Sequence, residues 1–159
     1  MSFPSISELI PQRGPAQWLS RVLGFEPPRL SCLGSLPSLA ASSRVEDSNG
    51  ALCLELLAQA AAAYGSLAEP LLAGQEGLVV SLSKLELYEV QVPTQVELCI
   101  EIVEEGRVGR ASQFSGSVSL SGVRMFEAEF LVVVSPKSNA AAASNAAAAS
   151  SELARSSSE

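Results

Sequence analysis

A predominantly apolar stretch over residues 50–68 constrains the fold of this 159-residue chain more than any other feature. Glu55, Gln59 and Gly65 interrupt the stretch, which makes it too polar for a membrane span. Leucine and alanine surround nearly the whole circumference of a helix built from these residues, and this is typical of a helix buried on most sides. The sequence therefore predicts one long core helix over residues 51–64. Gly65 is expected to end it, because glycine suits the left-handed conformation that follows many helix ends.

Segments with the two-residue periodicity of β-strands lie on both sides of the predicted helix. The clearest covers residues 95–104, where an apolar side chain at every second position predicts one buried and one solvent-facing side. Two strands are predicted before the helix and four after it, over Trp18–Phe25, Leu30–Leu36, Leu78–Val90, Gln95–Glu104, Arg110–Leu120 and Val123–Val134. Pro27 and Pro28 favour a turn between the first two strands, and Ser121-Gly122 favours a tight hairpin between the last two. This order predicts an α+β fold in which a curved antiparallel sheet wraps the helix.

The length of the chain is that of one domain, which we expect to span residues 1–135. Ser5 or Ser7 is suited to cap a short helical turn before the first strand. A polar loop over residues 42–50 is expected to lead into the core helix. Residues 136–159 consist mostly of serine, alanine and asparagine and offer no apolar face large enough to dock. They are predicted to form a tail that is disordered or at most marginally helical.

Charge and cysteine content exclude several classes of function. The formal net charge is -7, from 17 acidic and 10 basic residues, and no basic cluster is present, so nucleic acid is not an expected partner. Cys32, Cys53 and Cys99 lie far apart among apolar residues and are interpreted as small core side chains, without a disulfide framework or a metal site. No cofactor is indicated. The N-terminus lacks a basic segment followed by an apolar one, so we expect a cytoplasmic location.

The candidate chemistry centres on a carboxylate in the predicted core helix. The chain contains no histidine, which excludes Ser-His-Asp and Cys-His nucleophile systems. Glu55 is the only charged residue between Asp47 and Glu69, and burying a carboxylate without partners is costly. Gln59 follows four residues later on the same helix face, within hydrogen-bonding reach. The pattern fits either a functional carboxylate or one that is simply solvated or paired at an interface.

The helix segment "GALCLELLAQAAAAY" (residues 50–64) resembles the central helix of the bacterial β-hydroxyacyl-acyl-carrier-protein dehydratases. The pattern of that family is Pro-Gly, four residues, Glu or Asp, three residues and Gln, and Gly50, Glu55 and Gln59 match its last three specified positions. Three further segments are similar to that family in the same order: "LIPQRGPAQWLSRVLGF" (9–25), "KLELYEVQVP" (84–93) and "FEAEFLVVV" (126–134). The resemblance is closest to the small dehydratase-like branch of aryl polyene pathways, and it implies a hotdog fold.

The resemblance also implies roles for individual residues. In the family, a histidine removes the proton next to the thioester carbonyl and the helix carboxyl group protonates the departing hydroxyl. A backbone N–H at the helix N-terminus steadies the carbonyl oxygen. We therefore predict Glu55 as the catalytic residue, and Gly50, Gln59 and Gln12 as residues that bind substrate. The expected ligand is a thioester of acyl carrier protein or coenzyme A, from fatty-acid or polyene biosynthesis.

The base of the family is missing from this chain. Ala41 stands where the family places its catalytic histidine, and Gln12 replaces a second histidine near the N-terminus. Three enzymatic outcomes remain open: a half-catalytic or non-catalytic dehydratase subunit, a thioesterase that uses Glu55, and a dehydratase that uses Glu55 alone. A non-enzymatic partner that binds acyl chains is a further alternative. The chain is expected to form a homodimer, or a heterodimer with a histidine-bearing hotdog relative.

Overall fold

A computed structural model describes residues 2–38, 49–73, 75–89 and 91–135 of the chain. Its helices and strands follow in the order α1 (Ile6–Leu9), β1 (Leu19–Glu26), β2 (Arg29–Gly34), α2 (Cys53–Ala68), β3 (Gly77–Leu87), β4 (Leu98–Val108), β5 (Ala111–Leu120) and β6 (Val123–Val134). Short 3-10 turns lie at Gly14–Ala16, Gly50–Leu52 and Pro70–Leu72. Most of the predicted polar loop, residues 42–48, and the predicted tail, residues 136–159, lie outside the described residues.

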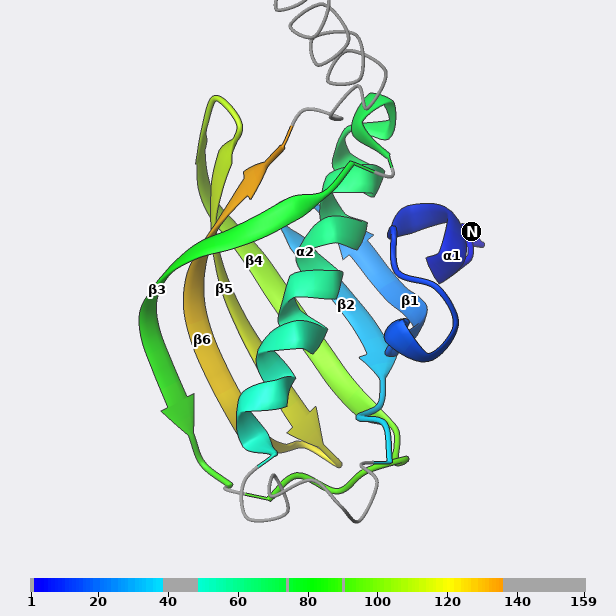
Figure 1. Cartoon of the computed structure of the whole chain (residues 1–159), viewed down its shortest axis with the longest axis vertical. Coiled ribbons are helices and arrows are strands. Elements are labelled where there is room, and N and C mark those ends of the chain that lie inside the picture. Colours follow the sequence, from blue (N-terminus) through cyan, green and yellow to red (C-terminus); the bar gives the residue numbers. More distant parts are fainter. Residues whose placement is uncertain (1, 39–48, 74, 90, 136–159) are drawn as a thin grey trace, which may run out of the picture.

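The six strands form one antiparallel sheet in the order β1-β2-β4-β5-β6-β3. The sheet curves, and α2 lies along its concave face (Figure 1). This is the α+β arrangement that the element order predicted and the hotdog fold that the resemblance implied. The order leaves β1 and β3 at the two edges, and β3 is bound to the sheet only through β6.

Helix α2 forms the core with the inner face of the sheet. Leu56 and Leu57 are fully buried, and they contact β2 and β5 where the sheet carries Gly34 and Gly116. A β-carbon at Gly116 would lie 2.9 Å from the Leu57 side chain, so glycine is required for this close approach. Glycines of the sheet, together with the small alanine side chains of the helix, therefore let α2 and the sheet approach closely.

Most element boundaries agree with the predictions, and the differences have local causes. Strand β6 covers the predicted residues, and Ser121 and Gly122 form the hairpin before it with φ of 50° and 79°. The prediction that Gly65 ends the helix is wrong, because α2 continues to Ala68 and Gly65 lies inside it. The start of β4 was also placed too early, since Gln95 has a φ of 56° and its N–H bonds to the Leu36 carbonyl instead of a neighbouring strand.

The segment before β1 packs against the second half of α2. Of the two predicted candidates, Ser5 and Ser7, it is Ser5 that forms the N-cap of α1. The Ser5 backbone N–H donates to the Glu8 carboxylate at 2.8 Å. Ile6 and Leu9 are buried in the core. The Ser66 hydroxyl of α2 donates to the Leu9 carbonyl at 2.6 Å. The N-terminal segment is therefore fixed to the same helix that carries Glu55.

Candidate functional site

Glu55 and Gln59 form the hydrogen-bonded pair that their spacing predicted. Gln59 Nε2 donates to Glu55 Oε1 at 2.9 Å and to the Ala16 carbonyl at 2.8 Å. Gln59 Oε1 accepts from the backbone N–H groups of Trp18 at 2.9 Å and Leu19 at 3.3 Å. The Gln59 side chain is fully buried, so both of its N–H donors and both acceptor positions are used inside the protein. This arrangement favours a positioning role for Gln59, because it holds one Glu55 oxygen and ties β1 to α2.

Glu55 itself is half-buried and opens onto a groove beside the first half of α2. We call this the Glu55 groove; its lining residues are Pro11, Gln12, Ala51, Leu52, Leu54, Glu55, Ala58, Ala62, Glu76, Gly77, Leu78 and Val79. The groove therefore combines α2, the segment before β1 and the start of the edge strand β3. It brings Gln12 to the same groove as Glu55, as expected if both contact one ligand.

Gln12 presents an unusual polar atom in this groove. Its Oε1 is buried and has no hydrogen-bond partner among the described residues. An unpaired buried acceptor costs about 1–3 kcal/mol, so it requires an explanation. A rotation of the Gln12 side chain that brings Oε1 into the groove would let an N–H or O–H group of a ligand remove this cost.

Gly50 lies at the start of the helical segment, where the resemblance placed the backbone N–H donor. It is buried and begins the 3-10 turn that leads into α2. The preceding Asn49 fixes this turn: its Nδ2 donates to the Val92 carbonyl at 2.6 Å, and the Val92 N–H donates to its Oδ1 at 2.7 Å. Sequence reasoning missed this pair, because the two residues are 43 positions apart. Ala41, the position of the family's histidine, lies outside the described residues.

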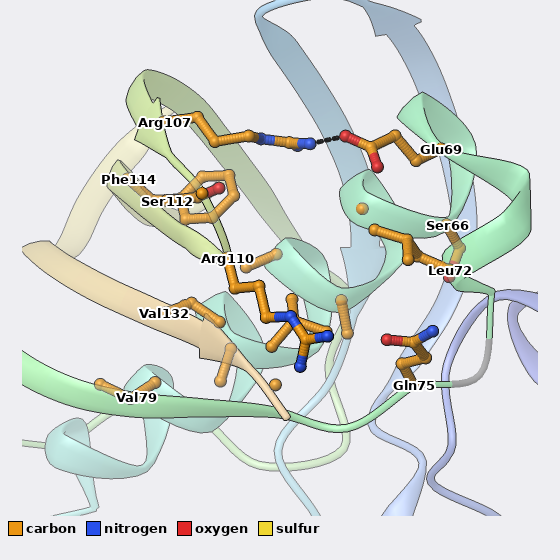
Figure 2. A pocket seen from close by; sticks show the side chains of 17 residues that line it. Ser66, Glu69, Leu72, Gln75, Val79, Arg107, Arg110, Ser112, Phe114 and Val132 are labelled. Carbon is orange, nitrogen blue, oxygen red and sulfur yellow. Dashed lines mark ion pairs between the residues drawn. The ribbon is translucent and has the colours of Figure 1, made fainter. Parts of the chain in front are cut away.

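A second hollow lies beside the second half of α2. This Arg110 cavity, of about 390 Å³, is lined by Ala58, Ala61, Ala62, Gly65, Ser66, Glu69, Leu72, Gln75, Gly77, Val79, Arg107, Gly109, Arg110, Ser112, Phe114, Val132 and Val134 (Figure 2). Ala58, Ala62, Gly77 and Val79 line both hollows. These residues, in the middle of α2 and at the start of β3, form a wall that both hollows share.

The remaining reactive groups are held in inert environments. The three cysteines are free thiols, and burial raises the pKa of Cys32 and Cys53 to about 12. This agrees with their interpretation as core side chains, since the thiolate is the reactive form. Burial, with a hydrogen bond to Glu104, also raises the pKa of Tyr64 to about 12. Among the described residues, no cluster of His, Cys, Asp or Glu has the composition of a metal site.

The helical segment Gly50–Ala68 is long and apolar enough to cross a bilayer by length and composition. In the folded chain it is the central helix of the hotdog fold, half-buried against the sheet. The prediction of a core helix is therefore confirmed.

Comparisons with known proteins agree with this geometry. The family model of ApeP-like proteins, described as ApeP dehydratase, matches residues 4–144. The dehydratase heterocomplex ApeI:P from Xenorhabdus doucetiae contains a similar chain, with a TM-score of 0.71 and 14% identity over 85% of this chain and 93% of that chain. Among proteins with curated functions, none matches the sequence significantly.

Two structures described as thioesterases share the fold at lower similarity. A hypothetical thioesterase with coenzyme A from Streptococcus pneumoniae has a TM-score of 0.51 and 11% identity, over 72% of this chain and 84% of that chain. A putative thioesterase from Ralstonia eutropha has a TM-score of 0.54 and 16% identity, over 71% of this chain and 83% of that chain.

Proposed function

Because the chain belongs to the ApeP-like dehydratase family, we propose that it is one subunit of a dehydratase for 3-hydroxyacyl thioesters bound to acyl carrier protein. In this proposal Glu55 is the acid of the site, and a second, histidine-bearing hotdog chain supplies the base. The observation that carries the proposal is the position of Glu55. It is held by Gln59 at an open groove beside an edge strand, in a chain that contains no histidine.

The proposed reaction divides the proton transfers between the two chains. The partner's histidine takes a proton from C2 of the acyl chain, and the electrons of that C–H bond form the C2–C3 double bond. The C3–O bond breaks, and Glu55 donates a proton to the departing hydroxyl, which leaves as water. The backbone N–H of Gly50 binds the thioester carbonyl oxygen as charge develops on it. Gln12 then accepts a hydrogen bond from the 3-hydroxyl or from an amide N–H of the phosphopantetheine arm.

The surface for the partner is proposed to be the edge strand β3. Leu82, Leu85 and Leu87 pair with buried residues of β6 and therefore face the concave side of the sheet. Yet they are 40–45% exposed in the single chain. An exposed edge strand with a row of leucines is a template for pairing with another chain. The heterocomplex of the similar Xenorhabdus protein supports a hotdog chain as that partner.

The test is a dehydration assay on the full-length chain, alone and together with a histidine-bearing hotdog protein, which is sought first among the products of neighbouring genes. We expect water elimination from a 3-hydroxyacyl-acyl carrier protein only in the mixture, or a strong increase over the partner alone. Glu55→Gln should lower this rate by about 100-fold or more, as removal of a general acid does. Glu97→Gln serves as the control, because Glu97 is an exposed glutamate before β4. A rate in the mixture that does not depend on Glu55 would contradict the proposal.

A thioesterase is the second candidate. It needs only a carboxylate that activates water or attacks the thioester, and two similar structures are described as thioesterases. Release of free thiol by the chain alone, abolished by Glu55→Gln, would favour it. Silence of the chain and of the mixture in both assays would favour a non-enzymatic partner that binds acyl chains.

A further inference from the structure

Asn49 occupies the N-cap position of the helical segment that begins at Gly50, but its side chain does not cap the helix. An asparagine at this position usually accepts a hydrogen bond from the second or third N–H group of the helix through its side-chain oxygen. The Asn49 side chain makes no such bond. The first N–H groups of the segment have no acceptors within the helix, and the side chain that normally satisfies one of them is turned away.

Both hydrogen-bonding groups of the Asn49 amide are used on a single residue of another segment. Nδ2 donates to the Val92 carbonyl at 2.6 Å, and Oδ1 accepts from the Val92 N–H at 2.7 Å. We call these two bonds the Asn49 clamp. They fix the orientation of the amide as well as its position, because a rotation that keeps one bond breaks the other. Asn49 is only 8% exposed, so water competes little for the clamp.

The segment that receives the clamp is itself held in the fold. The Val92 side chain is 2% exposed and belongs to the hydrophobic core. Three residues later, the Gln95 N–H donates to the Leu36 carbonyl at 2.9 Å. The clamp therefore ties Asn49 to a fixed part of the molecule.

The direction of the Gly50 N–H depends on Asn49. This N–H and the Asn49 carbonyl belong to one planar peptide unit. The Asn49 carbonyl accepts the Leu52 N–H at 2.9 Å, so it points into the first helical turn. In a trans peptide unit the N–H points the opposite way, which directs the Gly50 N–H out of the start of the helical segment. The peptide unit is thus held at two points, by the turn at its carbonyl and by the clamp at Asn49.

We propose that Asn49 is a positioning residue that aims the Gly50 N–H at the thioester carbonyl oxygen. This inference rests on the proposed function, in which the Gly50 N–H binds that oxygen. Ala51 and Leu52, directly after Gly50, line the Glu55 groove, so the groove reaches this end of the helical segment. A donor that is held in place before the reaction stabilises the developing charge without a cost of reorganisation. Asn49 acts through Gly50 and not on the substrate itself.

The first test is the infrared band of a carbon-13-labelled thioester carbonyl in a saturated acyl-coenzyme A, which can neither lose nor add water. The ligand is bound to the full-length chain together with its histidine-bearing partner. The band should lie at a lower frequency than in water, because a directed N–H in a sheltered site polarises the C=O bond more strongly. Asn49→Ala should return the band towards its frequency in water. Asn49→Asp, equal in size and still an acceptor for the Val92 N–H, is the second variant should alanine prevent folding.

The second test is dehydration of a 3-hydroxyacyl-acyl carrier protein by the same complex. Either substitution of Asn49 should lower kcat by about 10- to 100-fold and change KM by less than about threefold, because a misdirected donor affects the transition state more than substrate binding. Ser66→Ala is the matched control. The Ser66 hydroxyl donates to the Leu9 carbonyl at 2.6 Å, so this variant also loses a buried bond to a distant backbone group. It should leave the band and kcat unchanged.

The outcomes separate this inference from the proposed function. An unshifted band in the unmodified complex, or a band and kcat that the Asn49 substitutions leave unchanged, would overturn the inference while a rate that depends on Glu55 still supports the proposed function. Losses of equal size in Ser66→Ala and Asn49→Ala would also overturn the inference, since they would report stability alone. A complex that binds no acyl thioester would count against the proposed function itself.

Discussion

Gln59 is the residue that connects the candidate chemistry to the fold. The sequence indicated that it shares a helix face with Glu55, because helical residues four apart are neighbours. Its other partners lie 40 to 43 positions away and are backbone groups of the segment around Trp18. Backbone groups carry no signature in the sequence, so this part of the site was beyond prediction. The same reason explains why the pairing of Asn49 with Val92 was missed.

Gln59→Leu is expected to destabilise the chain and to release Glu55. Leucine has a similar size, but it leaves the N–H groups of Trp18 and Leu19 and the Ala16 carbonyl without their present partner. Each unsatisfied buried group costs about 1–3 kcal/mol, and partial relaxation lowers the sum, so we expect a loss of about 2–4 kcal/mol. Urea denaturation measures this change.

The matched control for this substitution is Gln113→Leu on β5. Gln113 is half-buried and has no side-chain hydrogen bond to another described residue. Its replacement should change the free energy of unfolding by no more than about 0.5 kcal/mol. Equal effects of the two substitutions would show that the hydrogen bonds of Gln59 do not stabilise β1 against α2.

At the scale of elements, the accuracy of the predictions depended on how local the governing interactions are. The limits of β6 followed from alternation and from a turn dipeptide, which are both local. The end of α2 could not be predicted from local signals, because a glycine ends a helix only where the chain after it turns away. Here the three residues after Gly65 continue the helix up to Glu69, whose N–H closes the last turn onto the Gly65 carbonyl.

Gly65→Ala is therefore expected to stabilise the protein. A β-carbon at this position would meet no atom within 4 Å, and Gly65 lies in the helix interior. Alanine loses less backbone entropy on folding than glycine, so the free energy of unfolding should rise by about 0.5–1 kcal/mol in urea denaturation.

Gly116→Ala provides the contrast, because its β-carbon would lie 2.9 Å from side-chain atoms of Leu57 and Ile102. It should lower the free energy by about 1–3 kcal/mol. A stabilising Gly116→Ala would show that α2 does not approach the sheet as closely as described.

At the scale of the whole molecule, the sheet order decides which apolar residues are left uncovered. The sequence shows that the third strand is rich in leucine, and it predicts a dimer. It does not show that β3 is an edge, because the order of strands depends on contacts between segments distant in the chain. The structure places β3 beside β6, at the end of the sheet. Its leucines thus become a surface, and Glu55 opens onto a groove that starts at the same strand.

The last prediction concerns assembly through this surface. Leu85→Lys should prevent pairing, because it places a charge in the middle of the apolar row on β3. Loss of one buried leucine costs about 2–3 kcal/mol, which corresponds to a dissociation constant raised by about 30- to 160-fold. Light scattering after size-exclusion chromatography, with the chain alone and with its partner, measures the change. Val108→Lys is the matched control, because Val108 is 84% exposed at the β4–β5 hairpin, away from this row. If Leu85→Lys assembles as the unmodified chain does, β3 is not the interface, and the base that completes the Glu55 site must come from elsewhere.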